Sequence, residues 1–122
     1  MPSQMRLQRI ENNIREILSE MLIREVSDPR VSGVFINDVD VDRELTFATV
    51  YVSSIEGHER AKEVLEGLES ASGFLRSALA SQIPLRTFPR LRFRWDPTPE
   101  HADKIERLLS DLKSQEKGTK EQ

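Results

Sequence analysis

Five arginines stand close together in the sequence and could bind a polyanion. The segment between Glu69 and Asp96 contains no acidic residue. Its basic residues are Arg76, Arg86, Arg90, Arg92 and Arg94. The whole chain has a formal net charge of −3, so the rest of the chain is more acidic than the net charge suggests. Because a ligand responds to the local field and not to the net charge, the segment predicts a basic surface on an acidic protein.

The last three of these arginines alternate with apolar residues, as in a half-buried strand. Leu91, Phe93 and Trp95 would point to one side, and Arg90, Arg92 and Arg94 to the other. The arginines would then follow one another at intervals of about 6 to 7 Å, near the phosphate spacing of one nucleic-acid strand. The alternative is an edge strand whose charges prevent aggregation. The absence of interleaved acids favours the polyanion.

A second candidate for anion binding is the triplet Ala71-Ser72-Gly73, which falls inside a long helical pattern. Serine and glycine pairs are frequent at helix kinks, and a break here would let Ser72 cap a new helix start. Backbone N–H groups at a helix start bind anions, and Arg76 lies one turn further on. The alternative is that Gly73 permits another element to pack closely.

Catalytic and metal-binding patterns are sparse. Asp38, Asp40 and Asp42 resemble the start of a calcium loop, but Arg43 and Thr49 stand where that loop needs glycine and glutamate. The chain has no cysteine, no glycine-rich phosphate loop and only two histidines. We therefore expect no catalytic residue, no metal site, no cofactor and no small-molecule substrate.

The apolar periodicity predicts six elements in the order α-β-β-α-β-α. A helix is expected over 3–26, two strands over 34–41 and 45–53 with a bulge near Asn37, a helix over 58–82 and a strand over 90–95. Thr98 is expected to cap a last helix whose buried face consists of Ile105, Leu108, Leu109 and Leu112. The prediction is an α+β domain in which three helices cover one face of a three-stranded sheet.

Length and composition indicate one domain, over residues 1–114, followed by a flexible tail over 115–122. No apolar run exceeds three residues, which excludes a signal-peptide core and a membrane span within the sequence. The absence of cysteine gives no sign of an oxidising compartment. We expect a cytoplasmic protein that acts as a monomer.

The order of these elements, together with several short motifs, resembles bacterial ribosome-binding factor A. The motifs are the turn 27–31 (SDPRV), the strand end 48–53 (ATVYVS), the segment 71–76 (ASGFLR) and the strand 86–93 (RTFPRLRF). The resemblance covers nearly the whole chain. It implies a KH-like fold of the second type in which a kinked helix with Ala71-Ser72-Gly73 replaces the usual G-x-x-G loop.

The resemblance also implies a function without catalysis. Members of this family are described as assembly factors that bind the free small (30S) ribosomal subunit. They assist late maturation and 5′-end processing of 16S rRNA and support growth in the cold. Because the chain is net acidic, RNA contact would depend on Arg76, Arg86 and the strand arginines, aided by Arg6 and Arg9 in the first helix.

Two other functions stay open from the sequence. A protein-protein adaptor could use the arginines as a basic docking face for an acidic partner. A small enzyme would need a pocket around His58 or His101.

Overall fold

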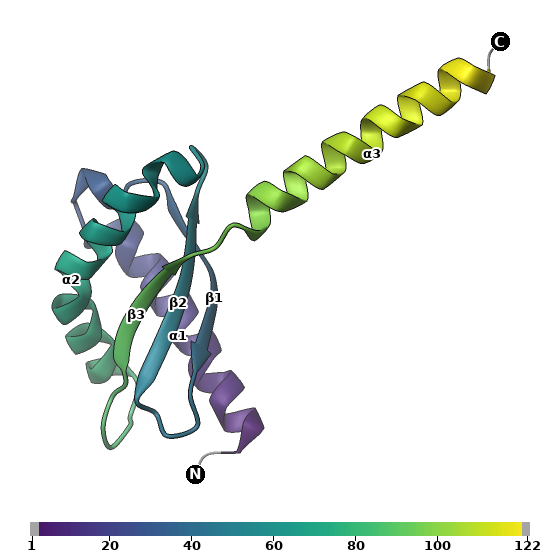
Figure 1. Ribbon diagram of the computed structural model, residues 1–122. Helices are drawn as coiled ribbons and strands as arrows, with labels where there is room; N and C mark the ends of the chain where they lie inside the picture. The colour runs from purple at the N-terminus through teal and green to yellow at the C-terminus, as the bar shows by residue number, and fades with distance from the viewer. Residues whose placement is uncertain (1–2, 121–122) are drawn as a thin grey trace.

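Two helices and a three-stranded sheet form the body of the protein, and a third long helix projects from it (Figure 1). The computed structural model describes residues 3–120, with side chains for 3–102 and 104–113. The elements are α1 (Gln4–Arg24), η1 (Pro29–Val31), β1 (Val34–Val41), β2 (Phe47–Ser54), η2 (His58–Arg60), α2 (Ala61–Gln82), β3 (Arg90–Trp95) and α3 (Thr98–Lys120).

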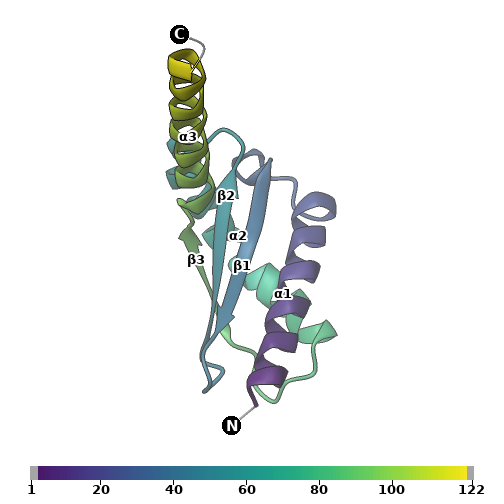
Figure 2. The ribbon, with the colours of Figure 1, turned by 90° about the vertical axis from the view of Figure 1, so that its right-hand side faces the viewer.

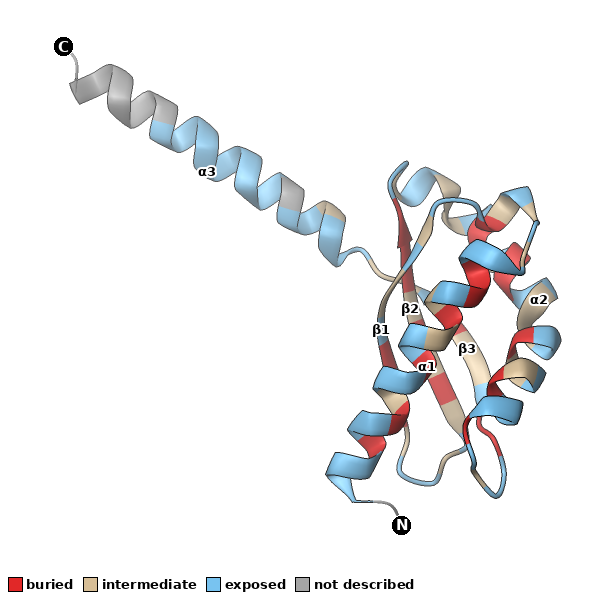
Figure 3. Cartoon of the chain, turned by 180° about the vertical axis from the view of Figure 1, so that it is seen from behind, coloured by how far each residue is buried: buried red, intermediate tan, exposed pale blue. Residues whose placement is uncertain are grey.

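The sheet has the order β1-β2-β3, with β2 in the centre. β1 and β2 form an antiparallel hairpin, whereas β2 and β3 are parallel and are joined by the crossover helix α2. α1 and α2 lie over the same face of the sheet, as Figures 2 and 3 show, and the opposite face is open. We call this uncovered side the open face.

The core lies between the two helices and the sheet. The apolar stripe of α1 is buried at Ile14 and Leu18, and α2 contributes Leu68, Leu75 and Leu79. The sheet supplies alternate residues of β2 together with Val39, Val41 and Phe93. In Figure 3 the buried positions lie on the sides of α1 and α2 that meet the sheet. The three-residue and four-residue spacing of apolar positions in the sequence correctly predicts both helix stripes.

The bulge expected near Asn37 is confirmed. Ile36 pairs with Val52 and Asp38 pairs with Tyr51, so Asn37 has no partner in the ladder. Because of this extra residue, the apolar residues before and after it point to the same side of the sheet. Its side-chain amide donates to Ser53 Oγ at 3.0 Å and to Asp96 Oδ2 at 3.1 Å, which ties β1 to the end of β3.

The hairpin loop is longer than the sequence pattern predicts, because β2 begins at Phe47 and not at Leu45. One carboxylate oxygen of Asp42 accepts hydrogen bonds from the backbone N–H groups of Thr46 and Phe47, both at 2.8 Å. Leu45 has a φ of 57°, which belongs to a turn and not to a strand. These aspartate bonds close the turn before the ladder starts.

The prediction that the third helix joins α1 and α2 over the sheet is wrong. α3 extends away from the body, as Figures 1 and 3 show. The residues expected to be its buried face are exposed: Ile105, Leu108, Leu109 and Leu112. Helical periodicity shows that these residues share one side of a helix, but it does not show what that side contacts.

The start of α3 also differs from the prediction. The helix already includes Thr98, whose backbone N–H donates to Asp96 Oδ1 at 3.0 Å. Asp96 and not Thr98 therefore supplies the capping oxygen. The helix continues to Lys120, beyond the domain boundary expected at residue 114, and residues 121–122 lie outside the described residues. Flexibility of the tail from residue 115 stays a prediction.

No helix in the described part of the chain combines the length and the apolarity needed to cross a membrane.

Candidate nucleic-acid interface

The predicted alternation in β3 is confirmed and places three arginines on the open face. Phe93 is buried against the helices, whereas Arg90 and Arg94 are exposed. In the parallel register Arg90, Arg92 and Arg94 are the partners of Phe47, Thr49 and Tyr51 of β2. We call these three residues of β3 the arginine column. It lies at an edge of the sheet beside a partly exposed column of two aromatic residues and a threonine.

The three arginines of the column do not have the same surroundings. The guanidinium carbon of Arg92 lies 3.9 Å from the centroid of the Phe47 ring, which is a cation–π contact. Among the described residues, Arg90 and Arg94 take part in no side-chain hydrogen bond or ion pair. The two outer arginines are therefore available to a ligand, whereas Arg92 is already held on its neighbour.

The opposite edge of the open face is acidic. Asp38 and Asp40 of β1 pair with Tyr51 and Thr49 of β2, two strands away from the column of arginines. Next to them, Glu11 Oε2 of α1 accepts from the Val41 N–H at 2.8 Å. Burial, followed by the nearby charges of Asp40 and Asp38, raises the pKa of Glu11, although the bond from Val41 acts against this. A polyanion would consequently be attracted to the β3 edge and repelled from the β1 edge.

Arg76 has a structural role that the sequence did not reveal. Its Nη2 donates to the carbonyl oxygen of Phe88 at 2.6 Å and its Nε to that of Pro89 at 3.2 Å. The side chain thereby ties α2 to the chain that enters β3. Contact of Arg76 with a phosphate stays a prediction, because the two bonds to backbone carbonyls use its Nε and Nη2 and involve no ligand.

The expected break at Ala71-Ser72-Gly73 is absent. α2 is one helix from Ala61 to Gln82, so Ser72 caps no new helix start. Figure 1 shows the axis of α2 changing direction along its length, and this bend occurs without loss of helical structure. The alternative of close packing at Gly73 is also wrong, since a Cβ at Gly73 would meet nothing within 4 Å.

The glycine that permits close packing is Gly67. A Cβ at Gly67 would lie 2.9 Å from both Arg30 Cβ and Val31 Cγ1 of η1. Asp28 caps η1 by accepting from the Arg30 N–H at 2.9 Å, and Pro29 stands at its first position. The SDPRV motif therefore forms a tight turn that packs on α2. The sequence signal that could have found this contact is a second helical glycine opposite a proline turn.

Arg60 fixes the same turn from the other side. Its guanidinium donates to the carbonyl oxygens of Ser32 at 2.5 Å, Arg30 at 3.0 Å and Pro29 at 3.2 Å. Hydrogen bonds to Glu63 and Glu56 raise its pKa further. This arginine is 17% exposed and has no free donor edge for a ligand, unlike Arg90 and Arg94.

The remaining predicted residues lie apart from the column. Arg86 is exposed in the connection between α2 and β3, and Arg6 and Arg9 are exposed in the first turns of α1. α1 covers the face opposite the column, so the structure does not bring Arg6 and Arg9 onto the open face (Figure 2). His58 Nδ1 lies 3.3 Å from Glu100 Oε2, and the described residues contain no cluster of potential metal ligands.

The architecture defines a class of protein: an α+β domain with a mixed three-stranded sheet, helices on one face and a KH-like fold. A family model for ribosome-binding factor A matches residues 6–109. The chain therefore belongs to the ribosome-binding factor A family.

Individual relatives agree with this assignment. The ribosome-binding factor A of Natranaerobius thermophilus is 38% identical over 90% of this chain and 84% of its own length. That of Alcanivorax borkumensis is 41% identical over 92% of this chain and 82% of its own length.

Two further structures extend the similarity to the fold. The crystal structure of ribosome-binding factor A from Thermus thermophilus has a TM-score of 0.63 at 27% identity, covering 72% of this chain and 93% of that one. A homology model of the Thermus thermophilus factor, fitted into the cryo-EM map of a 30S complex, has a TM-score of 0.60 at 27% identity. It covers 73% of this chain and 93% of that one.

Proposed function

We propose that this protein is a non-enzymatic assembly factor that binds the small ribosomal subunit through 16S rRNA. The observation that carries the proposal is the arginine column, whose outer members Arg90 and Arg94 are exposed and without side-chain partners among the described residues. The fitted model of a Thermus thermophilus relative in a 30S complex supports the choice of partner.

Within this proposal the chain acts in the cytoplasm as a monomer, on free subunits late in their maturation, and assists processing of the 16S rRNA 5′ end. Binding and not catalysis would be its mechanism: arginines that pair with RNA phosphates release the counterions held there. Arg86, exposed in the connection before β3, and Arg6 and Arg9 of α1 are secondary contacts outside the column. Support for growth in the cold belongs to the same proposal.

A co-sedimentation experiment tests the partner. Wild-type protein should pellet with free small subunits and much less with mature ribosomes. The Arg90→Ala/Arg94→Ala variant should lose most of this binding, and the triple variant that adds Arg92→Ala should lose more. The matched control is Arg24→Ala/Lys62→Ala, which removes two exposed cations from α1 and α2.

The results separate the proposal from its alternatives. If the control loses as much binding as the column variant, general charge and not the column is responsible. Treatment of a lysate with ribonuclease before capture should release the partner; a partner that stays bound would favour the protein-protein adaptor. Equal binding to free and mature subunits would contradict a role in assembly.

A further inference from the structure

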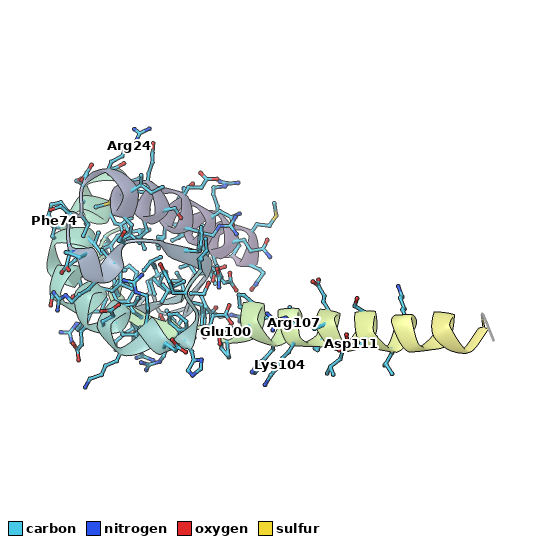
Figure 4. All side chains as sticks on the ribbon, turned by 90° about the horizontal axis from the view of Figure 1, so that it is seen from above. Arg24, Phe74, Glu100, Lys104, Arg107 and Asp111 are labelled. Carbon is cyan, nitrogen blue, oxygen red and sulfur yellow. The ribbon has the colours of Figure 1, made fainter. Side chains whose placement is uncertain are left out.

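A cavity of about 700 Å³ lies in the elbow where β3 leads into α3, and the arginine column does not use it. The body contributes Ile55, His58 and Trp95 to its lining, and α3 contributes His101, Lys104 and Arg107. We call this space the elbow cavity. It exists because α3 leaves the body at an angle instead of packing on the sheet, as Figure 4 shows from above.

The wall formed by α3 is polar. Glu100, Lys104 and Arg107 are spaced by four and three residues, so they share one side of the helix. Figure 4 shows them along the part of α3 next to the body. Among the described residues, Lys104 and Arg107 form no ion pair. Two cations that pair with no acid among the described side chains therefore border the cavity.

The wall formed by the body carries two large apolar side chains in addition to His58. Trp95 is half-buried at the end of β3, and Ile55 is 81% exposed just after β2. Together, Ile55 and the Trp95 ring offer an apolar surface on which a planar ring can stack. Aromatic surfaces next to unpaired cations are the combination with which proteins bind single-stranded nucleic acid.

Two polar atoms at the elbow are buried without a hydrogen-bond partner in the described structure: Trp95 Nε1 and Glu100 Oε1. The other oxygen of Glu100 is 3.3 Å from His58 Nδ1. Buried polar groups in folded proteins are nearly always paired, so an unpaired donor and an unpaired acceptor indicate that the elbow is incomplete. A nucleobase on the Trp95 ring carries edge donors that could pair with Glu100 Oε1 after a small opening of the elbow.

We propose that the elbow cavity binds one unpaired nucleotide of RNA. Its phosphate lies between Lys104 and Arg107, and its base stacks against Trp95 and Ile55. This inference rests on the proposed RNA-binding function and adds a contact that is separate from the arginine column. A single strand is the fitting ligand, because the bases of a duplex are stacked on one another and not free to enter a cavity.

Trp95 makes the proposal directly testable, because it is the only tryptophan in the chain. The probe is an eight-nucleotide oligouridylate. Its binding is measured by the fluorescence emission of Trp95 and, with a dye-labelled copy of the same RNA, by fluorescence anisotropy. Both signals should change and saturate together. The Lys104→Ala/Arg107→Ala variant should weaken the affinity read from Trp95 by about tenfold. The Arg24→Ala/Lys62→Ala control should leave it unchanged.

Three results would overturn the inference. An anisotropy change without any change in Trp95 emission would place the RNA elsewhere, and the proposed function would stand. No binding by either signal would overturn the elbow site alone if the protein still pellets with free small subunits, and the proposed function as well if it does not. An equal Trp95 response to an oligoglutamate of the same length would show a site for anions in general, without a role for the base.

Discussion

The guanidinium of Arg76 donates to the carbonyl oxygen of Phe88, 2.6 Å away, and thereby joins the crossover helix to the strand that follows it. The second bond, to the carbonyl of Pro89, fixes the chain at the residue before β3 begins. The arginine column starts at the next residue, Arg90. The position of the column relative to the helices thus depends on an arginine that is not part of it.

Removing the Arg76 side chain should lower stability. Arg76→Ala leaves two backbone carbonyls without their charged donor, which should reduce the free energy of unfolding by about 1–3 kcal/mol. In a domain of this size, each kcal/mol moves Tm by about 4–8 °C. Arg86→Ala is the matched control, since Arg86 is exposed, and it should change stability by less than about 0.5 kcal/mol. Equal melting of both variants would refute the structural role.

The two glycines of α2 should respond to alanine in opposite directions. Gly67→Ala places a Cβ 2.9 Å from Arg30 Cβ and Val31 Cγ1, and the overpacking should cost about 1–3 kcal/mol. Gly73→Ala meets open space and should stabilise the helix by about 0.5–1 kcal/mol. Urea unfolding of both variants measures the difference. A destabilised Gly73→Ala variant would show that the bend of α2 requires glycine there.

Replacing a leucine of α2 and a leucine of α3 by alanine should change the free energy of unfolding by very different amounts. Leu75 is fully buried, and Leu75→Ala should cost about 2–5 kcal/mol. Leu109 is 53% exposed, and Leu109→Ala should cost less than about 0.5 kcal/mol. Thermal melts of the two variants decide whether α3 packs on the body in solution. A large loss for Leu109→Ala would mean that it does.

Glu11 should make the free energy of unfolding depend on pH, and the Glu11→Gln substitution should remove this dependence. Its raised pKa means that the folded state holds the proton more tightly than the unfolded state. Its contribution to stability is therefore complete at low pH and falls as the pH rises from the ordinary value of 4.5 through the raised value. Glu11→Gln should match the wild type near pH 4 and be at least as stable at pH 7, because glutamine can still accept from the Val41 N–H. A stability difference independent of pH would contradict this account.

Binding to the small subunit should weaken steeply with salt. Three to five phosphate contacts predict a slope of about −2 to −4 when the logarithm of affinity is plotted against that of salt concentration. Removing Arg90 and Arg94 should make the slope shallower by about 2. Sedimentation at a series of potassium chloride concentrations measures both slopes. A flat response of the wild type would exclude electrostatic binding through the column.

The fold of the body could be predicted from the sequence because its signals are local. The stripes of α1 and α2 and the alternation around Phe93 each reflect one regular period, and the bulge at Asn37 follows from apolar residues that change sides. The column of arginines follows from the same alternation. The exposure of this column on an uncovered face could not be predicted, because it depends on whether α3 packs on the sheet.

The contacts that sequence reasoning misses or misjudges join residues far apart in the chain. The structural role of Arg76 could not be predicted, because its partners are backbone carbonyls, which leave no trace in side-chain identity. The sequence pattern singles out Gly73, and only the packing of η1 on α2 identifies Gly67 as the glycine in close contact. In α3 an apolar stripe suggests burial, although the stripe does not specify its partner.

The parallel pairing of β2 with β3 has a consequence for how the chain folds. Phe47 must pair with Arg90, far along the chain, so this half of the sheet closes only after α2 has crossed over. Such distant contacts cost loop entropy before they contribute stability and therefore form slowly. During synthesis the hairpin of β1 and β2 can form early. The other edge of β2 stays unpaired until β3 has been made. The arginines of β3 are thus placed on the sheet only when the domain as a whole is complete.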